Sequence, residues 1–126
     1  MLTILHFFIN KQEFVTNANS IDSIVKFTNE VSLTKLPEYG DNATVGVYKY
    51  HDKIYQINDA AVMLNCPSDK PRSFMLLFDN GQGLLVDAVS KVDTIEEHEL
   101  SQSPIVSRHV KRVYIYGDSV IPMIDF

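Results

Sequence analysis

Several residue types in this chain could carry chemistry, and the carboxylates of its second half come first. Asp87, Asp118 and Asp125 are the set that could act in acid–base catalysis or bind a metal ion. However, Asp118 falls in an expected hairpin turn and Asp125 at the end of an expected strand, so nothing forces the three together. The four histidines, at positions 6, 51, 98 and 109, lack the short spacings of metal ligands. We therefore expect neither a catalytic site nor a metal site.

The potential nucleophiles are equally isolated. Cys66 is the only cysteine, so an internal disulfide is impossible and a reducing compartment fits. No histidine is adjacent to it. Ser90 and Ser107 lack the G-x-S-x-G turn of a hydrolase nucleophile. The segment Asn80-Gly81-Gln82-Gly83 lacks the Lys-Ser/Thr of a phosphate-binding loop. We expect a chain that is not an enzyme and needs no cofactor.

Composition and charge disfavour other classes of function. The 126 residues are 45% hydrophobic and 21% charged, which is typical of a folded domain. There are 11 basic and 16 acidic residues, and the net charge of −5 disfavours a nucleic-acid partner. The apolar segment Leu2–Ile9 is too short to span a bilayer and lacks the features of a signal peptide. We expect a cytoplasmic protein without direct membrane insertion.

The elements that would position these residues are mostly strands. Apolar runs on both sides of Asn80-Gly81 indicate a hairpin, because Asn and Gly tolerate the positive φ angles of a tight turn. Similar runs flank His51-Asp52 and Gly117-Asp118. The three expected hairpins span residues 45–57, 74–86 and 110–124.

Little helix is expected. A short helix is predicted over residues 60–64, with Asn58 or Asp59 as its N-cap. One further helical turn is predicted after Thr94, with this residue as its cap. The segment Cys66–Pro71, with two prolines, is the linker-like stretch between the halves and predicts a chain reversal.

The two halves of the chain resemble each other. At a constant offset of 66, five of the thirteen residues in 47–59 are identical to their counterparts in 113–125. These five are Val47, Tyr48, Tyr50, Asp52 and Asp59. Upstream, at a slightly different offset, Ile21 and Ile24 align with Val89 and Val92. Any two hairpins could share such residues by composition, but the common order over most of both halves favours a duplicated unit.

A duplicated unit of short strands predicts the architecture. Such a unit buries one face of each strand, and removes exposed edges, by curling into a small barrel. We expect one all-β domain over residues 1–126, with lobe one at about 10–65 and lobe two at about 72–126 plus the N-terminal strand. The groove between two such lobes is the natural place to bind a partner.

The motifs of the second half resemble the CheW family of chemotaxis coupling proteins. Gly83–Val92 is similar to the family's G-L-x-V-D-x-V-S-x-V strand pair, and Val120–Asp125 is similar to its closing V-x-P-x-I-D strand. The first half follows the same scheme more loosely, in the segments Phe8–Val15, Ile21–Ile24, Leu33–Pro37 and Gly46-Val47. The resemblance covers nearly the whole chain.

The resemblance implies two intertwined five-stranded SH3-like barrels without catalytic activity. Proteins of this family are signalling adaptors that bridge the cytoplasmic tips of chemoreceptors to a histidine kinase. They dock on the CheW-like regulatory domain of the kinase, which is of the CheA type. Carried over by matching positions, the partner-binding residues around the groove are Ile21, Ser23, Ile24, Gly46, His51 and Val89.

The chain departs from the family pattern at three places. Ser23 stands where the family usually has Glu, and Lys49-Tyr50-His51-Asp52 stands where it has an Asn-x-Arg-Gly turn. We therefore expect the acidic and basic anchors of the receptor contact to be lost. The chain ends at Phe126, where the family normally continues into a C-terminal helix. These departures leave a related pathway, such as twitching motility, open beside chemotaxis.

A second class of function also stays open. The chain could be a small-barrel protein, unrelated to chemotaxis, that binds a ligand or single-stranded nucleic acid. The pairs Tyr48/Tyr50 and Tyr114/Tyr116 could stack on bases, although no basic surface is interleaved with them. Oligonucleotide binding with a steep salt dependence would favour this alternative.

Overall fold

The computed structural model describes residues 1–35, 42–105 and 107–125, and its regular structure is almost entirely β. The strands are β1 (Leu2–Ile9), β2 (Gln12–Asn17), β3 (Ile21–Lys26), β4 (Thr44–Tyr50), β5 (Lys53–Asp59), β6 (Phe74–Phe78), β7 (Gln82–Val86), β8 (Ala88–Ile95), β9 (Leu100–Gln102), β10 (Val110–Tyr116) and β11 (Ser119–Ile124). The helical segments are α1 (Ala60–Met63) and the 3-10 turns η1 (Ala18–Ser20) and η2 (Glu97–Glu99). The expected all-β class with little helix is thus confirmed.

Two parts of the sequence-based expectations lie outside the described residues: residues 36–37, at the end of the expected Leu33–Pro37 segment, and the terminal Phe126. Within the described residues, none of the helices is both long and apolar enough to cross a bilayer.

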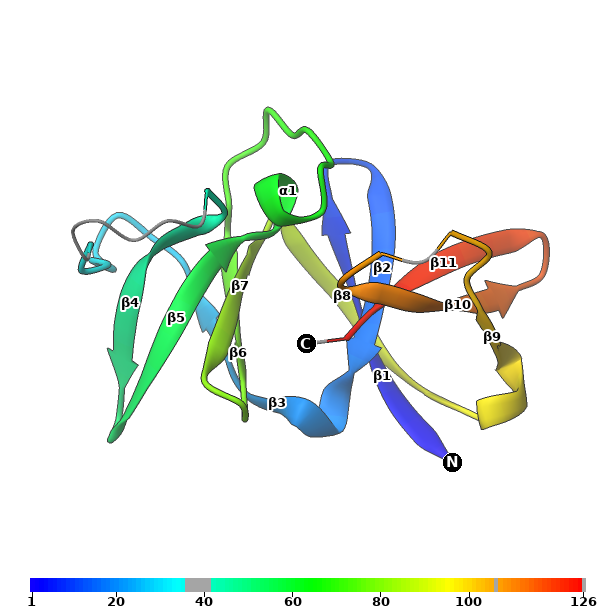
Figure 1. Ribbon diagram of the computed structural model, residues 1–126. Coiled ribbons are helices and arrows are strands. Elements are labelled where there is room, and N and C mark those ends of the chain that lie inside the picture. Colours follow the sequence, from blue (N-terminus) through cyan, green and yellow to red (C-terminus); the bar gives the residue numbers. More distant parts are fainter. Residues whose placement is uncertain (36–41, 106, 126) are drawn as a thin grey trace.

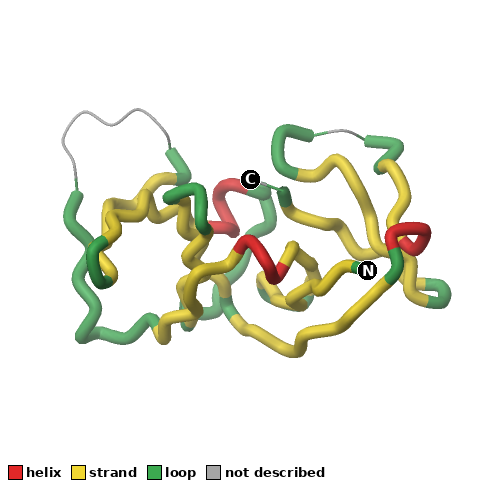
Figure 2. The backbone as a smooth tube through the Cα atoms, turned by 90° about the horizontal axis from the view of Figure 1, so that it is seen from below, coloured by secondary structure: helices red, strands yellow, loops and turns green. Residues whose placement is uncertain are grey.

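The strands form two mixed sheets that lie side by side (Figure 1, Figure 2). The six-stranded sheet has the order β8-β1-β2-β11-β10-β9, and the five-stranded sheet has the order β3-β6-β7-β5-β4. The expectation that each sheet closes into a five-stranded barrel is wrong. Within the described residues, the two outer strands of each sheet do not pair with each other. Edge β9 has three residues, and Thr34 bridges to Val47 on edge β4. Short or partly covered edges limit unwanted pairing without closure of the sheet.

Each sheet combines strands from both halves of the chain. In the five-stranded sheet, the β6–β7 hairpin of the second half lies between β3 and β5 of the first half. In the six-stranded sheet, the β1–β2 hairpin of the first half lies between β8 and β11 of the second half. The parallel pair β5–β7 in one sheet has its counterpart in the parallel pair β11–β2 in the other. This exchange of hairpins makes the two halves intertwined.

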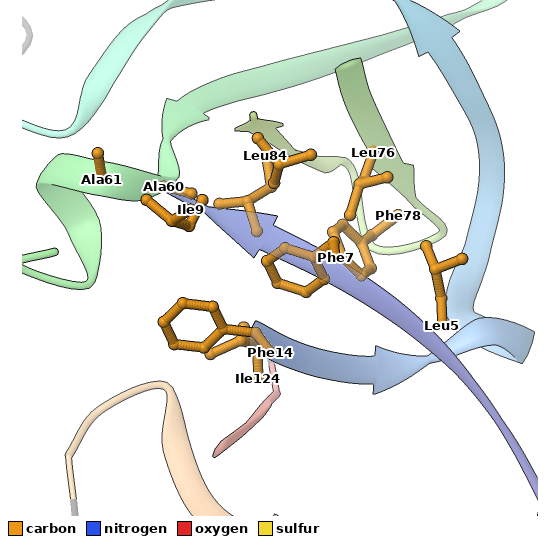
Figure 3. Close-up of a cluster of buried hydrophobic side chains, with 11 residues drawn as sticks. Leu5, Phe7, Ile9, Phe14, Ala60, Ala61, Leu76, Phe78, Leu84 and Ile124 are labelled. Atoms are coloured by element: carbon orange, nitrogen blue, oxygen red, sulfur yellow. The ribbon is translucent and has the colours of Figure 1, made fainter. Parts of the chain in front are cut away.

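The largest cluster of buried side chains joins the two sheets (Figure 3). The six-stranded sheet contributes Phe7 and Phe14, whose stacked rings have centroids 5.6 Å apart. The five-stranded sheet contributes Leu76 and Leu84, and α1 contributes the small side chain of Ala60. Because burial of apolar area stabilises by about 25 cal/mol per Å², separating the sheets would be costly. We call this group the central core.

Each sheet also encloses a smaller core of its own. In the six-stranded sheet this core includes Ile4, Tyr114 and Met123. In the five-stranded sheet it includes Tyr55 and Met75. Each sheet therefore curls around its own apolar cluster, while the central core binds the two together.

The local turn and cap predictions are mostly correct. His51 and Gly117, at the turns of the β4–β5 and β10–β11 hairpins, both have positive φ, of 55° and 59°. Asp59 caps α1 by accepting a hydrogen bond from the backbone N–H of Ala61. The prediction of Thr94 as a cap is wrong, because Thr94 continues β8 and Glu96 stands at the N-cap of η2.

A buried carboxylate holds the junction between the two sheets. Asp87 is the single residue between β7 and β8, which belong to different sheets. Its Oδ2 accepts hydrogen bonds from Asn10 N and Ser68 Oγ, each at 2.5 Å. Its Oδ1 accepts one from Arg72 Nη1 at 2.8 Å, and Arg72 Nε also donates to Asp59 Oδ1 at 2.8 Å. This network fixes the start of β8 relative to both sheets.

Candidate functional site

A shallow groove lies where the two sheets meet on the outside of the molecule. One wall is β3 of the five-stranded sheet, and the other is formed by β1 and β8 of the six-stranded sheet. We call it the inter-sheet groove. Its lining residues are Leu5, Ala18, Ile21, Asp22, Ser23, Ile24 and Val92. The sequence-based prediction put the partner-binding surface in a groove between the two lobes.

Apolar side chains are exposed on both walls of the groove. Ile24 of β3 is 45% exposed, and Val92 of β8 is 57% exposed. Single exposed apolar residues are common on protein surfaces, but these two converge on one concave surface, which makes the groove a candidate interaction site. The inter-sheet groove therefore suits a partner with an apolar face.

The two walls match each other through the internal repeat. Ile21 and Val89 occupy equivalent positions, and both are half-buried against the central core. Ile24 and Val92, the next equivalent pair, are both exposed and both line the groove. The same alternation of packed and exposed residues is thus built twice, once on each wall.

The carboxylate of Asp22 adds a charge to this apolar surface. Its Oδ2 accepts hydrogen bonds from Tyr55 Oη at 2.7 Å and from Lys53 Nζ at 3.0 Å. These two hydrogen bonds, that of Tyr55 first, lower the pKa of Asp22. Burial, with the hydrogen bond to Asp22, raises the pKa of Tyr55 to about 12. At neutral pH, Asp22 is therefore an anion held in place by a neutral tyrosine.

The structure brings together only some of the residues predicted from the family pattern. Ile21, Ser23 and Ile24 line the inter-sheet groove. Val89 lies on the adjoining strand β8 but packs against the central core. His51 lies outside the groove, exposed in the β4–β5 turn, with its ring 4.3 Å from that of Tyr50.

Gly46 has a structural reason for its identity. A Cβ at this position would lie 2.7 Å from Thr34 O and 3.2 Å from Leu33 Cβ. The backbone of the preceding segment therefore occupies the space of a side chain. Gly46 lies on β4, at the opposite edge of the sheet from β3, and does not line the groove.

Four residues of the groove were missed by sequence reasoning: Leu5, Ala18, Asp22 and Val92. Val92 could have been found from its repeat alignment with Ile24. Asp22 gave a weaker signal. The family pattern has an acidic residue at the position of Ser23 and a basic residue at the position of His51, and this chain lacks both. An ion pair nevertheless joins the same two segments: Asp22 lies one residue before Ser23, and Lys53 lies two residues after His51.

A second exposed apolar surface lies at the tip of each long hairpin. Ile54 of β5 and Val120 of β11 are equivalent in the repeat and are 65% and 62% exposed. Val120 is paired across the strands with Ile115, which is also exposed. The partner of Ile54 is Lys49 instead. The β10–β11 hairpin therefore carries the more apolar of the two tips.

The residues considered first for chemistry are separated in the fold. Asp87 pairs with Arg72, whereas Asp125 pairs with Arg112 at 3.3 Å. Among the described residues, no group of three or more His, Cys, Asp or Glu side chains is placed to hold a metal ion. The Cys66 thiol is half-buried, and burial, followed by the charge of Asp87, raises its pKa.

His6 is buried among polar groups of the six-stranded sheet. Its Nδ1 lies 2.6 Å from Glu13 Oε2, and its Nε2 lies 2.7 Å from Asp93 Oδ2. The two carboxylates come from the flanking strands β2 and β8. The side chain of His6 thus links three neighbouring strands, and we assign it a structural role in the six-stranded sheet.

Comparison with known proteins bears on the whole chain. A family model described as CheW-like domain matches residues 3–126. The crystal structure of the scaffolding protein TtCheW from Thermoanaerobacter tengcongensis superimposes with a TM-score of 0.84 at 23% sequence identity. The match covers 99% of this chain and 89% of that chain, so the two share a fold. A search among curated proteins found no match.

Proposed function

This chain belongs to the family of CheW-like domains, and we therefore propose that it is a non-enzymatic adaptor that links chemoreceptors to a histidine kinase. The inter-sheet groove receives the helical cytoplasmic tip of a receptor. A separate surface docks on the CheW-like regulatory domain of the kinase. The pathway is chemotaxis or a related form of motility, and the place of action is the cytoplasm.

The observation that carries the receptor contact is the exposure of Ile24 and Val92 on facing walls of one groove. Helical partners present apolar side chains along one face, and such a face fits a groove with two apolar walls. The fully buried central core beneath the groove keeps the two walls at a fixed separation. The groove is therefore ready for a partner before binding.

The kinase contact is assigned to the tip of the β10–β11 hairpin. Ile115 and Val120 form an exposed apolar cross-strand pair there. A few well-packed residues near the centre of an interface carry most of its binding energy, and we place this pair at that centre. The tip lies on a different part of the six-stranded sheet from β8, so one chain can bind two partners.

The test uses two protein fragments encoded in the same genome as this chain: a receptor cytoplasmic tip and the regulatory domain of the kinase. The double variant Ile24→Glu/Val92→Glu should weaken receptor binding by about tenfold or more and leave kinase binding unchanged. The variant Val120→Glu should have the reverse effect.

The matched control is Val62→Glu, because Val62 is 50% exposed on α1, away from both surfaces. It should bind both fragments normally. Titration calorimetry measures each affinity, and circular dichroism shows that each variant is folded. If the double groove variant binds the receptor fragment as tightly as the unmodified chain, the groove is not the receptor site.

A further inference from the structure

The inter-sheet groove has two apolar walls that are nearly equivalent and one charge that is not repeated. Of the described residues that line it, Asp22 alone is ionisable. At the repeat offset that aligns Ile24 with Val92, the position equivalent to Asp22 is Ser90. Apolar walls related in this way would accept a helix in either direction. A single charge on one wall removes that equivalence.

The carboxylate of Asp22 is held in one position by hydrogen bonds, but it can still accept a further hydrogen bond. Among the described residues its two donors, Tyr55 Oη and Lys53 Nζ, bind the same oxygen, Oδ2. The side chain is still 36% exposed. A carboxylate can accept about four hydrogen bonds, so Oδ1 has room for another donor. Tyr55 is 3% exposed and cannot move away without opening the core of the five-stranded sheet.

We propose that Asp22 is the specificity determinant of the inter-sheet groove: it selects an amphipathic helix with an arginine or lysine beside its apolar stripe and sets the direction in which that helix lies. This inference rests on the proposed receptor-binding function of the groove. The basic side chain of the partner binds Asp22 Oδ1, while the apolar stripe contacts Ile24 and Val92. The uncharged Ser90 on the other wall offers the same basic residue no anion.

Lys53 limits the strength of this selection. Its Nζ is shared between Asp22 Oδ2 and the backbone oxygen of Asp79, at 3.0 and 2.7 Å. In the free protein it neutralises part of the charge that a partner would meet. Removal of the Lys53 charge should therefore sharpen the preference for a basic partner, a result that a purely structural role for Asp22 would not produce.

The experiment uses three synthetic helical peptides of about 20 residues, long enough to form a helix. They share one leucine stripe and differ only in carrying Arg, Gln or Glu beside it. We expect the Arg peptide to bind the unmodified chain about two- to fivefold more tightly than the Gln peptide, and the Glu peptide to bind more weakly, as for exposed ion pairs. The difference should shrink as salt is added.

Three variants make the test specific. Asp22→Asn should abolish the preference while the Gln peptide still binds, and Lys53→Met should increase it. Asp118→Asn removes the same charge from the exposed β10–β11 turn and should leave the preference intact. A spin label at the end of the Arg peptide nearest its arginine should broaden amide signals around Asp22 and not around Ser90.

The outcomes separate this inference from the proposed function. If all three peptides bind equally and shift the signals of Ile24 and Val92, the groove is a helix site but Asp22 does not select its occupant. If no peptide affects these signals, both proposals fail. If binding instead protects the backbone amides of β3 or β8 from hydrogen exchange, as an added strand would, the occupant is not a helix and the inference is overturned.

Discussion

Ile24 and Val92 occupy equivalent positions in the two halves of the chain, and both are exposed in the same groove. They come from different sheets: β3 is one of the two outer strands of the five-stranded sheet, and β8 is one of the two outer strands of the six-stranded sheet. The exchange of hairpins between the halves brings these outer strands to one junction. The internal repeat thus supplies both walls of the candidate site.

The network around Asp87 should contribute strongly to stability. Replacing Asp87 by Ala leaves the Arg72 guanidinium, whose side chain is 16% exposed, without one of its anions. We expect the free energy of unfolding to fall by about 3–5 kcal/mol, as for other buried ion pairs that lose one partner. Urea denaturation measures this change. The control Asp118→Ala, at an exposed turn, should change the value by about 0.5 kcal/mol or less, and similar values for the two variants would contradict the role of the network.

Substitution of Gly46 should act on folding and not directly on binding. Because a Cβ would lie 2.7 Å from the Thr34 backbone oxygen, Gly46→Ala should lower the free energy of unfolding by about 1–3 kcal/mol. The exposed Lys49 on the same strand provides the control, since Lys49→Ala removes no packed group. Thermal unfolding compares the two. An unchanged melting temperature for Gly46→Ala would mean that the Thr34 segment moves aside at little cost.

The repeat predicts a stabilising substitution at His51. This residue has a φ of 55°, and its counterpart Gly117 has a φ of 59°, a conformation that favours glycine. We expect His51→Gly to raise the free energy of unfolding by about 0.5–1 kcal/mol and Gly117→Ala to lower it by a similar amount. If His51→Gly is destabilising, the contact of its ring with Tyr50 outweighs the backbone effect. Since the variant is expected to fold better, any loss of partner binding would identify His51 as a contact residue.

Alkaline titration should reveal the contact between Tyr55 and Asp22. The pKa of Tyr55 is raised from 10.0 to about 12, so the folded state keeps it protonated where an unfolded chain would lose the proton. Its contribution to stability is therefore complete below pH 10 and is lost between pH 10 and about 12. Ultraviolet absorbance should show one tyrosine ionising near pH 12 that is absent in Tyr55→Phe. Ionisation of all tyrosines near pH 10 in the folded protein would contradict the contact.

Asp22, the other partner of this contact, loses its contribution to stability when the pH falls, whereas Tyr55 loses its contribution when the pH rises. The pKa of Asp22 is lowered from 3.8, so its contribution is present above that value and is lost as the pH falls through the lowered pKa.

The local elements were predictable from the sequence because their signals lie within a few residues. Asn80-Gly81 marks a tight turn, and Asp59 accepts a hydrogen bond two residues ahead. The repeat was visible for the same reason, because two hairpins with matching side chains at matching spacing can be recognised without knowing which strands lie beside them. The failure at Thr94 shows the limit, since pairing of β8 with β1 extends the strand over a residue whose local preference suggests a cap.

Four features depended on the tertiary structure. Whether a sheet closes depends on contacts between strands far apart in sequence, and neither sheet closes here, within the residues described. The exchange of the β1–β2 and β6–β7 hairpins between the sheets also depends on the tertiary structure. The alternation of apolar residues shows which face of a strand is buried, but it does not show which strand will be its neighbour. The groove follows from that choice, and so does the Asp22–Lys53 pair, which joins residues 31 positions apart. The sequence alone determined most of the strands and turns and their repetition, since local backbone preferences suffice for these. Only packing across the sheets decided which strands meet and where the charge beside the groove lies.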